Sequence, residues 1–449
     1  MNMRKRIFLT VPFLLLLVAG RAQVPDVRVT RAEHLLSLLV KEEYGAVVSQ
    51  FDSVLRERLP ATMLQQVWES LQQQVGPYRA CEHFTVERSD PYFSVLLTCR
   101  YGKGVLLDLK LVYDDRGKVT GIFFFPSRQY TWEIPSYADT TRFVREPFVV
   151  ESDGYRLHGE MTTPVDTSFY PVVVMVQGSG PMDMDETIGP NKIFRDLAYG
   201  LSSHGIAVIR YNKRTFEYAG RLSGDSLTVW EETIDDAVAA VRLAEKIPGA
   251  SGVFLLGHSL GGYLAPRIAT RAPGLSGLIL MAANTRPLPR LILQQTTYLL
   301  SLDTLTAAER AQLDTLRKKV ERVLQGDYDT TTPADQLPLG IPARYWLDLQ
   351  QYDPLATVDS LTLPMLIMQG GRDYQVTTLD FNEWKHALAS RTNVDFRIYG
   401  DLDHLFLPGD GKSRPEDYLL PSHVPGKVIL DIVDWIRNVP RKAFGFPTI

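Results

Sequence analysis

Residues 252–262 read GVFLLGHSLGG, and this stretch decides the fold. An apolar, β-rich run ends in a turn where Gly257 and Gly261 stand two residues on either side of Ser259, and a helical pattern, YLAPRIATRA, begins at residue 263. The G-x-S-x-G pattern between a strand and a helix is typical of a sharp turn in which side chains larger than hydrogen would collide at the glycine positions. The pattern predicts that the Ser259 hydroxyl stands above the end of a strand, at the positive end of a helix.

Short apolar runs alternate with helical patterns from residue 143 onward. An antiparallel hairpin is expected first, because FVVES and YRLHGEMTTP flank Asp153-Gly154. Continuous β-rich runs separated by helices are typical of a parallel sheet covered on both faces. We therefore predict an α/β fold with a mostly parallel, eight-stranded sheet over residues 143–449. The remaining expected strands are PVVVMVQG (171–178), IAVIRY (206–211), GVFLLG (252–257), LSGLILMA (275–282), LPMLIMQG (363–370) and VDFRIYG (394–400).

A long insertion interrupts this alternation. Two amphipathic helical patterns, roughly 288–302 and 306–325, lie between the fourth and fifth of these six runs. An insertion that follows the carboxyl end of a strand and carries its own helices is typical of a lid over a site. We predict a lid over about 284–345, with the aromatic residues Tyr298, Tyr345 and Trp346 shaping an acyl pocket. The alternative is a structural excursion packed elsewhere.

A serine hydroxyl needs a base before it can act as a nucleophile at neutral pH. In the chain order that accompanies G-x-S-x-G, the acid follows the serine and the histidine comes last. Asp373 follows the strand LPMLIMQGG, and His404 follows the last strand. Both residues are expected in loops at the carboxyl edge of the sheet, where open α/β sheets place their ligands. We predict Ser259, Asp373 and His404 as the catalytic residues, with Asp401 and Asp403 as alternative acids.

Attack on an acyl carbon creates an oxyanion, which requires preorganised hydrogen-bond donors. One expected donor is the backbone N–H of Leu260, the residue after the nucleophile. The other is expected in the loop QGSGP, residues 177–181, where glycines allow the backbone to approach the substrate. We predict the N–H of Ser179 as this second donor of the oxyanion hole.

Residues 143–449 resemble the α/β-hydrolase superfamily, through the motifs GHSLGG, GGRD, LDH and QGSGP in the expected order. QGSGPMDMDE followed by LAYGLSSHGIAVIRYNKR resembles exported bacterial esterases that are grouped with serine aminopeptidase-like and acyl-thioester hydrolases. The resemblance implies hydrolysis of short-chain acyl esters without a cofactor. The chain departs from the relatives at Gln177, where many have histidine, and at YNKRTFEYAG, which replaces an acidic, glycine-rich loop beside the pocket.

Three other functions remain open from the sequence. The same triad serves serine peptidases and acyl thioesterases, and an aminopeptidase needs a carboxylate to hold the substrate ammonium. Asp183, Asp185 and Glu186, just past the oxyanion loop, are candidates for that carboxylate. A non-catalytic binding protein is the third alternative.

The chain has no H-E-x-x-H or C-x-x-C motif and no G-x-G-x-x-G after a strand. We therefore expect neither a metal nor a nucleotide cofactor.

The N-terminal part of the chain predicts a separate domain. Helical periodicity over residues 28–75 gives way to strand patterns over 80–125, which indicates a small α+β domain at 23–126. This pattern resembles the cystatin-like domain, related to the nuclear transport factor fold, that precedes hydrolase domains in some exported bacterial proteins. Residues 127–142, rich in proline and aromatic residues, are expected to form a linker. A homodimer through the N-terminal domain is a further expectation.

The first residues predict export. Arg4, Lys5 and Arg6 precede an apolar run over 7–20, and small residues follow at a suitable cleavage site. The run is shorter than the roughly 17–25 residues that span a bilayer. We predict a signal peptide at 1–22 and a periplasmic or secreted bacterial protein, with an uncleaved membrane anchor as the alternative. The net charge of −4 gives no reason to expect a nucleic-acid partner.

The two cysteines, Cys81 and Cys99, lie in a predicted hairpin whose turn contains Asp90. A turn centred on Asp90 places residue 88 opposite 92 and Cys81 opposite Cys99. Cross-strand neighbours lie at about the distance that a disulfide requires. An exported chain favours a disulfide between them, and two buried free thiols are the alternative.

Overall fold

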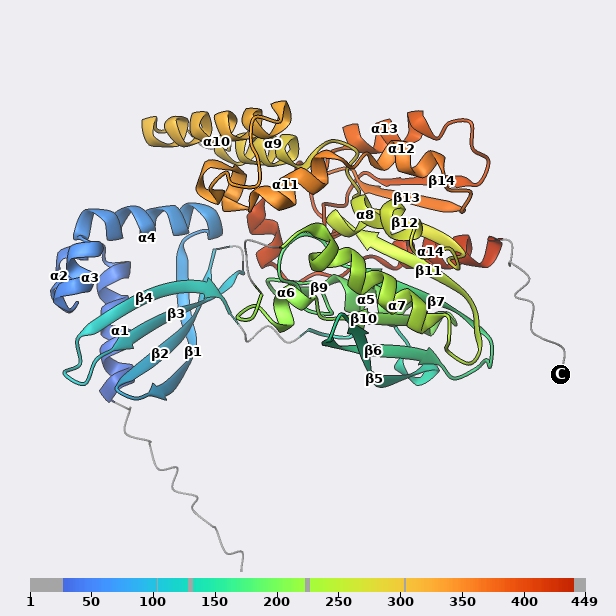
Figure 1. The fold of residues 1–449 in the computed structure, drawn as a ribbon. Helices are drawn as coiled ribbons and strands as arrows, with labels where there is room; N and C mark the ends of the chain where they lie inside the picture. The colour runs from blue at the N-terminus through green and yellow to red at the C-terminus, as the bar shows by residue number, and fades with distance from the viewer. Residues whose placement is uncertain (1–26, 103, 128–131, 223–226, 303, 440–449) are drawn as a thin grey trace, which may run out of the picture. The chain divides into compact units, whose positions relative to one another are not determined.

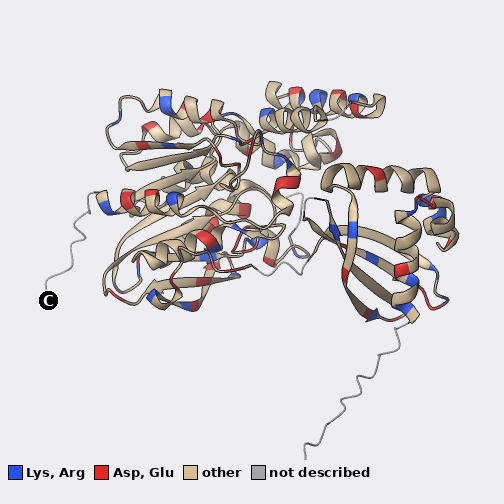
Figure 2. Ribbon diagram, turned by 180° about the vertical axis from the view of Figure 1, so that it is seen from behind, with Lys and Arg blue, Asp and Glu red and all other residues tan. Residues whose placement is uncertain are grey.

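The computed structural model describes residues 27–102, 104–127, 132–222, 227–302 and 304–439. The chain divides into two compact units, residues 1–103 with 107–125 and residues 104–106 with 126–449. The predicted signal peptide at 1–22 lies outside the described residues. Charged residues of both signs are distributed over each unit (Figure 2).

The N-terminal unit packs helices against an antiparallel sheet (Figure 1). The sheet has the order β1-β2-β3-β4, as expected for a meander. Trp68, from the fourth helix, is buried against Tyr101 and Phe124 of the sheet. The elements are α1 (Val27–Val40), α2 (Tyr44–Ser49), α3 (Ser53–Arg58), α4 (Ala61–Val75), β1 (Tyr78–Ser89), β2 (Tyr92–Tyr101), β3 (Leu106–Tyr113) and β4 (Val119–Pro126).

The β1–β2 hairpin pairs Cys81 with Cys99, although the register at its turn differs from the expected one. Arg88 lies opposite Phe93 rather than opposite residue 92, and a register shift between Cys81 and His83 restores the expected pairing of the cysteines. The predicted disulfide is not formed, because both cysteines are free thiols. Each thiol instead donates a hydrogen bond to a carbonyl two residues away on its own strand.

The second unit contains an eight-stranded sheet of order β14-β13-β12-β11-β7-β10-β6-β5, which confirms the predicted α/β-hydrolase fold. The β5–β6 hairpin is antiparallel, and β6 also pairs antiparallel with β10. The other neighbouring strands of the sheet, β10, β7, β11, β12, β13 and β14, pair parallel. The strands are β5 (Phe143–Ser152), β6 (Tyr155–Pro164), β7 (Tyr170–Val176), β10 (Ala207–Tyr211), β11 (Ala250–His258), β12 (Gly277–Met281), β13 (Met365–Gly370) and β14 (Val394–Tyr399).

Helices cover both faces of this sheet (Figure 1). One core joins the sheet to α7 (Asp235–Ala244), α8 (Leu260–Ala269) and α13 (Thr378–Ala387). The opposite core joins it to α5 (Ile193–Ser203) and α14 (Gly426–Asn438). Since apolar side chains are buried on both faces, the parallel strands read as continuous apolar runs rather than as alternating patterns.

The insertion between β12 and β13 begins with two long helices, α9 (Leu288–Leu300) and α10 (Ala307–Gln325). A capping box at Thr306 and Glu309 begins α10, and Gly326, with φ +72°, ends it. The insertion continues through η4 (Ala334–Gln336), η5 (Pro338–Gly340), α11 (Ala343–Gln350) and α12 (Pro354–Asp359).

Shorter elements complete the unit, and part of the predicted linker belongs to it. Trp132 donates a hydrogen bond from Nε1 to Asp196 of α5 at 2.8 Å, and the amide of Asp139 bonds to Ser203. Residues 132–142 are therefore packed against the hydrolase unit. The remaining elements are η1 (Thr140–Arg142), β8 (Thr187–Ile188), β9 (Asn191–Lys192), α6 (Arg214–Glu217), the π-helical turn η3 (Trp230–Ile234) and η6 (Pro415–Leu419).

The free thiols generate a test. The interaction with the neighbouring Cys99 thiol lowers the pKa of Cys81, whereas the same interaction and burial raise the pKa of Cys99. Since the thiolate is the reactive form, we expect iodoacetamide to modify partly exposed Cys81 at least about tenfold faster than buried Cys99. Mass spectrometry of peptides from the native, unreduced protein measures both rates, with protein unfolded in guanidinium as the control. A peptide pair linked through Cys81 and Cys99 would contradict the structure.

Candidate active site

The site lies where the parallel strands end. The strands β7, β11 and β12 end at one edge of the sheet, where Gly257 pairs with Val176 and His258 pairs with Met281. The segment after β7 supplies the oxyanion loop, residues 177–181, and the segment after β11 supplies Ser259. The segment after β12 supplies part of the pocket wall, and the segments after β13 and β14 supply Asp373 and His404. Five chain segments, distant in sequence, therefore meet at a single edge.

Ser259 occupies the strained turn that its neighbours predict. Its backbone has φ +52° and ψ −117°, between the end of β11 and the start of α8. A Cβ atom at Gly257 would collide with the carbonyl of Gly261, and one at Gly261 would collide with the carbonyl of Val176. The Ser259 amide donates a hydrogen bond to Met281 at 2.9 Å, which ties the turn to the neighbouring strand.

His404 bridges Ser259 and Asp373. Its Nδ1 lies 2.7 Å from Oδ2 of Asp373, and its Nε2 lies 3.1 Å from Oγ of Ser259. The other oxygen of Asp373 accepts the amides of Gln375 and Val376, at 2.7 and 3.0 Å. Since these donors hold the carboxylate, Nδ1–H donates to it and Nε2 is left as the acceptor for the serine hydroxyl.

The alternative acids do not contact the imidazole. Asp403 is buried, and its Oδ1 accepts the amides of Leu405 and Leu407, at 2.8 and 2.9 Å. It therefore shapes the turn that carries His404. Asp401 is exposed. Of the three aspartates considered, Asp373 alone bonds to His404.

The backbone amides of two residues beside Ser259 are candidates for the oxyanion hole. Ser179 and Leu260 both line the pocket that contains Ser259, and neither amide makes a hydrogen bond within the described part of the chain. The flanking amides are occupied, since Gly178 donates to Glu186 at 2.7 Å and Gly180 donates to Glu232 at 3.1 Å. The loop thus leaves the Ser179 amide unpaired between two fixed neighbours, which suits an oxyanion donor.

A buried ion pair supports the same loop. Lys213 and Glu232 are almost fully buried and lie 2.6 Å apart. Lys213 also donates to the carbonyl of Gly178 at 2.9 Å, and the second oxygen of Glu232 accepts the hydroxyl of Tyr345 at 2.7 Å. Gln177, the first residue of this loop, donates to the carbonyls of Tyr211 and Asp183.

An apolar chamber of about 480 Å³ adjoins Ser259. A volume of this size is typical of sites for small organic molecules. The segment after β10 also borders the chamber, as the sequence predicts, through Thr215, Ala219 and Leu222. Its aliphatic lining includes Leu222, Leu227, Leu288, Leu291, Ile292 and Ile341.

Two aromatic residues assigned to the pocket lie elsewhere. Tyr345 lines the chamber, but Tyr298 donates its hydroxyl to Ser413 at 3.1 Å and stacks on Tyr374. Trp346 is fully buried and donates to the carbonyl of Ile341. Tyr345 and Trp346 are neighbours on α11, so they point in different directions and only one of them reaches the chamber.

The three acidic residues considered for an aminopeptidase are also outside the chamber lining. Asp183 accepts the amide and hydroxyl of Thr187, and buried Asp185 forms ion pairs with Arg210 and Arg195. Glu186 is buried against Gly178 and His258. Each carboxylate is therefore engaged in holding the loop.

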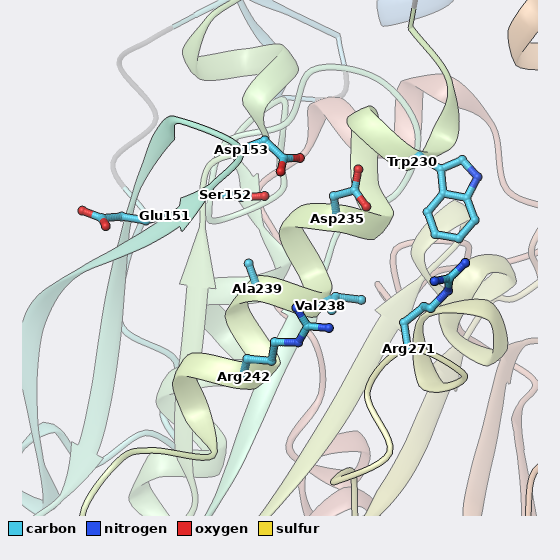
Figure 3. A pocket seen from close by; sticks show the side chains of 9 residues that line it. All are labelled: Glu151, Ser152, Asp153, Trp230, Asp235, Val238, Ala239, Arg242 and Arg271. Carbon is cyan, nitrogen blue, oxygen red and sulfur yellow. The ribbon is translucent and has the colours of Figure 1, made fainter.

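A second hollow in the same unit contains none of the triad residues (Figure 3). Its walls carry charged groups of both signs, unlike the apolar chamber beside Ser259. The charged lining residues are Glu151, Asp153, Asp235, Arg242 and Arg271.

Within the described ranges there is no cluster of three or more residues suited to hold a metal ion. None of the described helices has the length and apolar content to cross a membrane.

The fold and the Asp373–His404–Ser259 arrangement define a serine hydrolase of the α/β-hydrolase class. The sequence is 36% identical over 398 residues to Esterase EstD of Thermotoga maritima, an alignment that covers 89% of this chain and 92% of the relative. The chain therefore belongs to the α/β-hydrolase family of serine hydrolases that includes this esterase, as the sequence motifs predict.

Family models match both parts of the chain. Residues 191–410 match the family described as serine aminopeptidase, S33, and this range contains Ser259, Asp373 and His404. Residues 32–122 match a family described as a protein of unknown function (DUF3887).

The chain also shows similarity to solved esterase structures. Est1E from Butyrivibrio proteoclasticus aligns with a TM-score of 0.43 and 15% identity, over 65% of this chain and 99% of that one. The esterase Pf2001 of Pyrococcus furiosus aligns with a TM-score of 0.42 and 13% identity, over 66% and 91%.

Sequence reasoning missed the side chains that hold the site together. Gln369, at the end of β13, donates to Asp373 at 3.1 Å and to the carbonyl of Val376 at 2.9 Å. No role for Lys213 or Glu232 is predicted from the sequence. A polar residue inside an otherwise apolar run, as Gln369 is in LPMLIMQGG, is the one local signal that marks such a position.

Asp403 generates a pH-dependent prediction. Burial raises the pKa of Asp403 to about 6, although two backbone hydrogen bonds oppose the shift. The folded state thus binds this proton more tightly than the unfolded state, so the stabilisation is complete below about pH 4 and is lost as the pH rises through 6. Asp403→Asn, which keeps an acceptor oxygen, is expected to exceed the parent protein in stability by about 1–3 kcal/mol at pH 8 and to match it near pH 4.

Thermal unfolding midpoints between pH 4 and 8 measure this difference. Asp401→Asn is the matched control, because the neighbouring aspartate is exposed, and its midpoints are expected to follow those of the parent protein. A lower midpoint for Asp403→Asn than for the parent at pH 8 would contradict the prediction.

Proposed function

We propose that this protein hydrolyses carboxylic esters through an acyl-enzyme on Ser259. The observation that carries the proposal is the unbroken hydrogen-bond line from Asp373 through His404 to Ser259, beside an apolar chamber. A serine hydroxyl within 3.1 Å of an oriented imidazole nitrogen is arranged for proton transfer as it attacks.

In the first half-reaction, Oγ of Ser259 attacks the acyl carbon and its proton passes to Nε2 of His404. Asp373 keeps the imidazole in the tautomer that can accept this proton and stabilises the imidazolium that forms. The amides of Ser179 and Leu260 hold the developing oxyanion. Collapse of the tetrahedral intermediate expels the alcohol, which takes the proton from His404.

In the second half-reaction, water replaces the alcohol. His404 removes a proton from the water as its oxygen attacks the acyl-enzyme carbon, and the same two amides stabilise the second tetrahedral intermediate. The proton returns to Oγ of Ser259 when the carboxylic acid leaves. No step requires a group beyond those that the chain and water supply.

The charges in the chamber favour esters over peptides with a free N-terminus. Among the described lining residues, Glu232 is the one carboxylate, and its two oxygens are occupied by Lys213, Gly180 and Tyr345. A substrate ammonium would have to displace a buried lysine to reach it. We therefore expect aminoacyl para-nitroanilides to be hydrolysed at less than about 1% of the rate of the matched para-nitrophenyl esters, at equal active-site concentration.

The aliphatic lining favours an acyl chain longer than acetyl. Each buried methylene contributes about 0.8 kcal/mol, or roughly fourfold in kcat/KM if the contact persists in the transition state. The chamber is larger than an acetyl group requires. The proposed substrates are therefore uncharged esters of short acids of more than two carbons. Acyl thioesters carry the same acyl group, but the export proposed below would separate the chain from cytosolic thioesters.

Two variants and an ester series test the proposal. Ser259→Ala is expected to lower kcat by roughly 10⁴–10⁶-fold and to abolish labelling by a fluorophosphonate probe. Ser179→Ala, the matched control, keeps its backbone donor and is expected to retain kcat within about threefold. For the parent enzyme, kcat/KM should rise from para-nitrophenyl acetate to the butanoate. Full activity of Ser259→Ala would rule out the mechanism, and a maximum at acetate would rule out the substrate assignment.

Export and self-association are separate proposals. The basic and apolar pattern over residues 4–20 supports cleavage after residue 22. Expression in a bacterial host followed by N-terminal sequencing is expected to find the chain in the periplasm, beginning near residue 23; an intact Met1 in the cytoplasm would contradict this.

The homodimer through the N-terminal domain remains a prediction, which sedimentation equilibrium tests.

A further inference from the structure

Two buried ionisable side chains near Ser259 have no part in the proposed proton transfers. Glu186 and His258 are each 2% exposed. Glu186 belongs to the loop after β7, and His258 is the last residue of β11, directly before Ser259. Burying charged groups costs folding free energy unless they are paired, so we expect these two side chains to serve a purpose that offsets this cost.

The contacts of His258 require a proton in the pair. Its Nε2 lies 2.8 Å from the carbonyl oxygen of His404, and its Nδ1 lies 3.0 Å from Oε1 of Glu186. A carbonyl oxygen only accepts, so Nε2 carries a hydrogen. A second proton must then be shared between Nδ1 and the Glu186 carboxylate. Burial lowers the pKa of His258, but the charge and hydrogen bonds of its neighbours outweigh burial and raise it, which agrees with this assignment.

The pair joins the three segments that carry the chemistry. Oε1 of Glu186 also accepts the amide of Gly178 at 2.7 Å, directly before Ser179. His258 is covalently next to Ser259 and holds the carbonyl of His404. One carboxylate and one imidazole therefore connect the oxyanion loop, the nucleophile turn and the base loop.

The geometry of Glu186 is unfavourable by itself. Its backbone has φ +49°, a left-handed conformation that residues with a side chain seldom adopt. Its second carboxylate oxygen is buried and has no hydrogen-bond partner among the described residues. Strain and an unsatisfied polar atom persist where the surrounding structure enforces them, and such features concentrate at functional sites.

We propose that Glu186 and His258 are positioning residues, which together hold the oxyanion donor and the catalytic imidazole at fixed distances from Ser259. The inference rests on the proposed role of Ser259 in ester hydrolysis. The pair does not touch the substrate. It acts through the amide of Ser179 and the backbone of His404, so its loss weakens interactions made in the transition state more than those made with bound substrate.

The test compares Glu186→Gln, His258→Gln and the double variant with the parent enzyme. Turnover of para-nitrophenyl butanoate is measured per active site, titrated with a fluorophosphonate. Binding of a trifluoromethyl ketone is measured in parallel. In that complex Oγ of Ser259 bonds to the carbonyl carbon, its proton passes to Nε2 of His404, and the carbonyl oxygen becomes an oxyanion. The ketone therefore reports on the oxyanion hole without turnover.

Each single variant is expected to lower kcat by about 10–100-fold with KM changed less than about threefold, and to weaken ketone binding by a similar factor. The double variant is expected to lose little more than the more damaged single variant, because two residues that act as a unit are not additive. Asp196→Asn is the matched control. Asp196 accepts from His423 at 3.0 Å in another histidine–carboxylate pair that contacts neither the oxyanion loop nor His404, so kcat and ketone binding should stay within about twofold.

The proposal is overturned if both single variants keep kcat per titrated site and ketone affinity within twofold of the parent enzyme, even with lower unfolding midpoints. It is also overturned if neither variant folds, since the pair would then be needed for stability. These outcomes are distinct from failure of the proposed function. That failure would appear in the parent enzyme, as absence of fluorophosphonate labelling or of ester turnover.

Discussion

The strained turn at Ser259 is the constraint on which the rest of the site depends. Its left-handed backbone lifts the hydroxyl above the sheet, where it meets His404 at 3.1 Å, and leaves the next amide unpaired toward the chamber. Gly257 and Gly261 are required because any side chain there would enter the neighbouring backbone. The Ser259 turn itself depends on the parallel strands, because their common edge brings the loops after β7, β13 and β14 beside Ser259.

The site is organised at a cost in stability. Ser259 and Glu186 both have positive φ values, a kind of strain that typically costs on the order of 1–3 kcal/mol per residue. Lys213 and Glu232 are buried as a charged pair, although apolar residues of similar size are often at least as stable. These features surround one loop and leave the Ser179 amide unpaired at its centre. Their shared consequence is a preorganised oxyanion hole, which needs no rearrangement as charge develops.

The chamber shows how the insertion contributes to specificity. Residues of α9, such as Leu288 and Leu291, and residues around 339–342 form aliphatic walls, whereas no residue of α10 is among the described lining residues. Tyr345 contributes through its hydroxyl, which caps Glu232 and keeps that carboxylate away from substrate. The insertion therefore supplies apolar walls, and its Tyr345 occupies an oxygen of Glu232, the one carboxylate among the described lining residues. Membership of an esterase family and the character of the chamber point to the same class of substrate.

The sequence by itself determined the parallel sheet, the serine turn and the order of Ser259, Asp373 and His404, because each depends on local patterns: continuous apolar runs, glycine spacing and positions at strand ends. Only the tertiary structure decided which neighbours these residues have. Gln369, Lys213, Glu232 and the Glu186–His258 pair contact other segments of the chain, and the contact between His258 and His404 joins residues 146 positions apart in sequence. It also decided that Cys81 and Cys99 are free thiols and that Tyr345 alone of the three predicted aromatics lines the chamber. Contacts between distant segments depend on side-chain directions and register shifts, which no local pattern encodes.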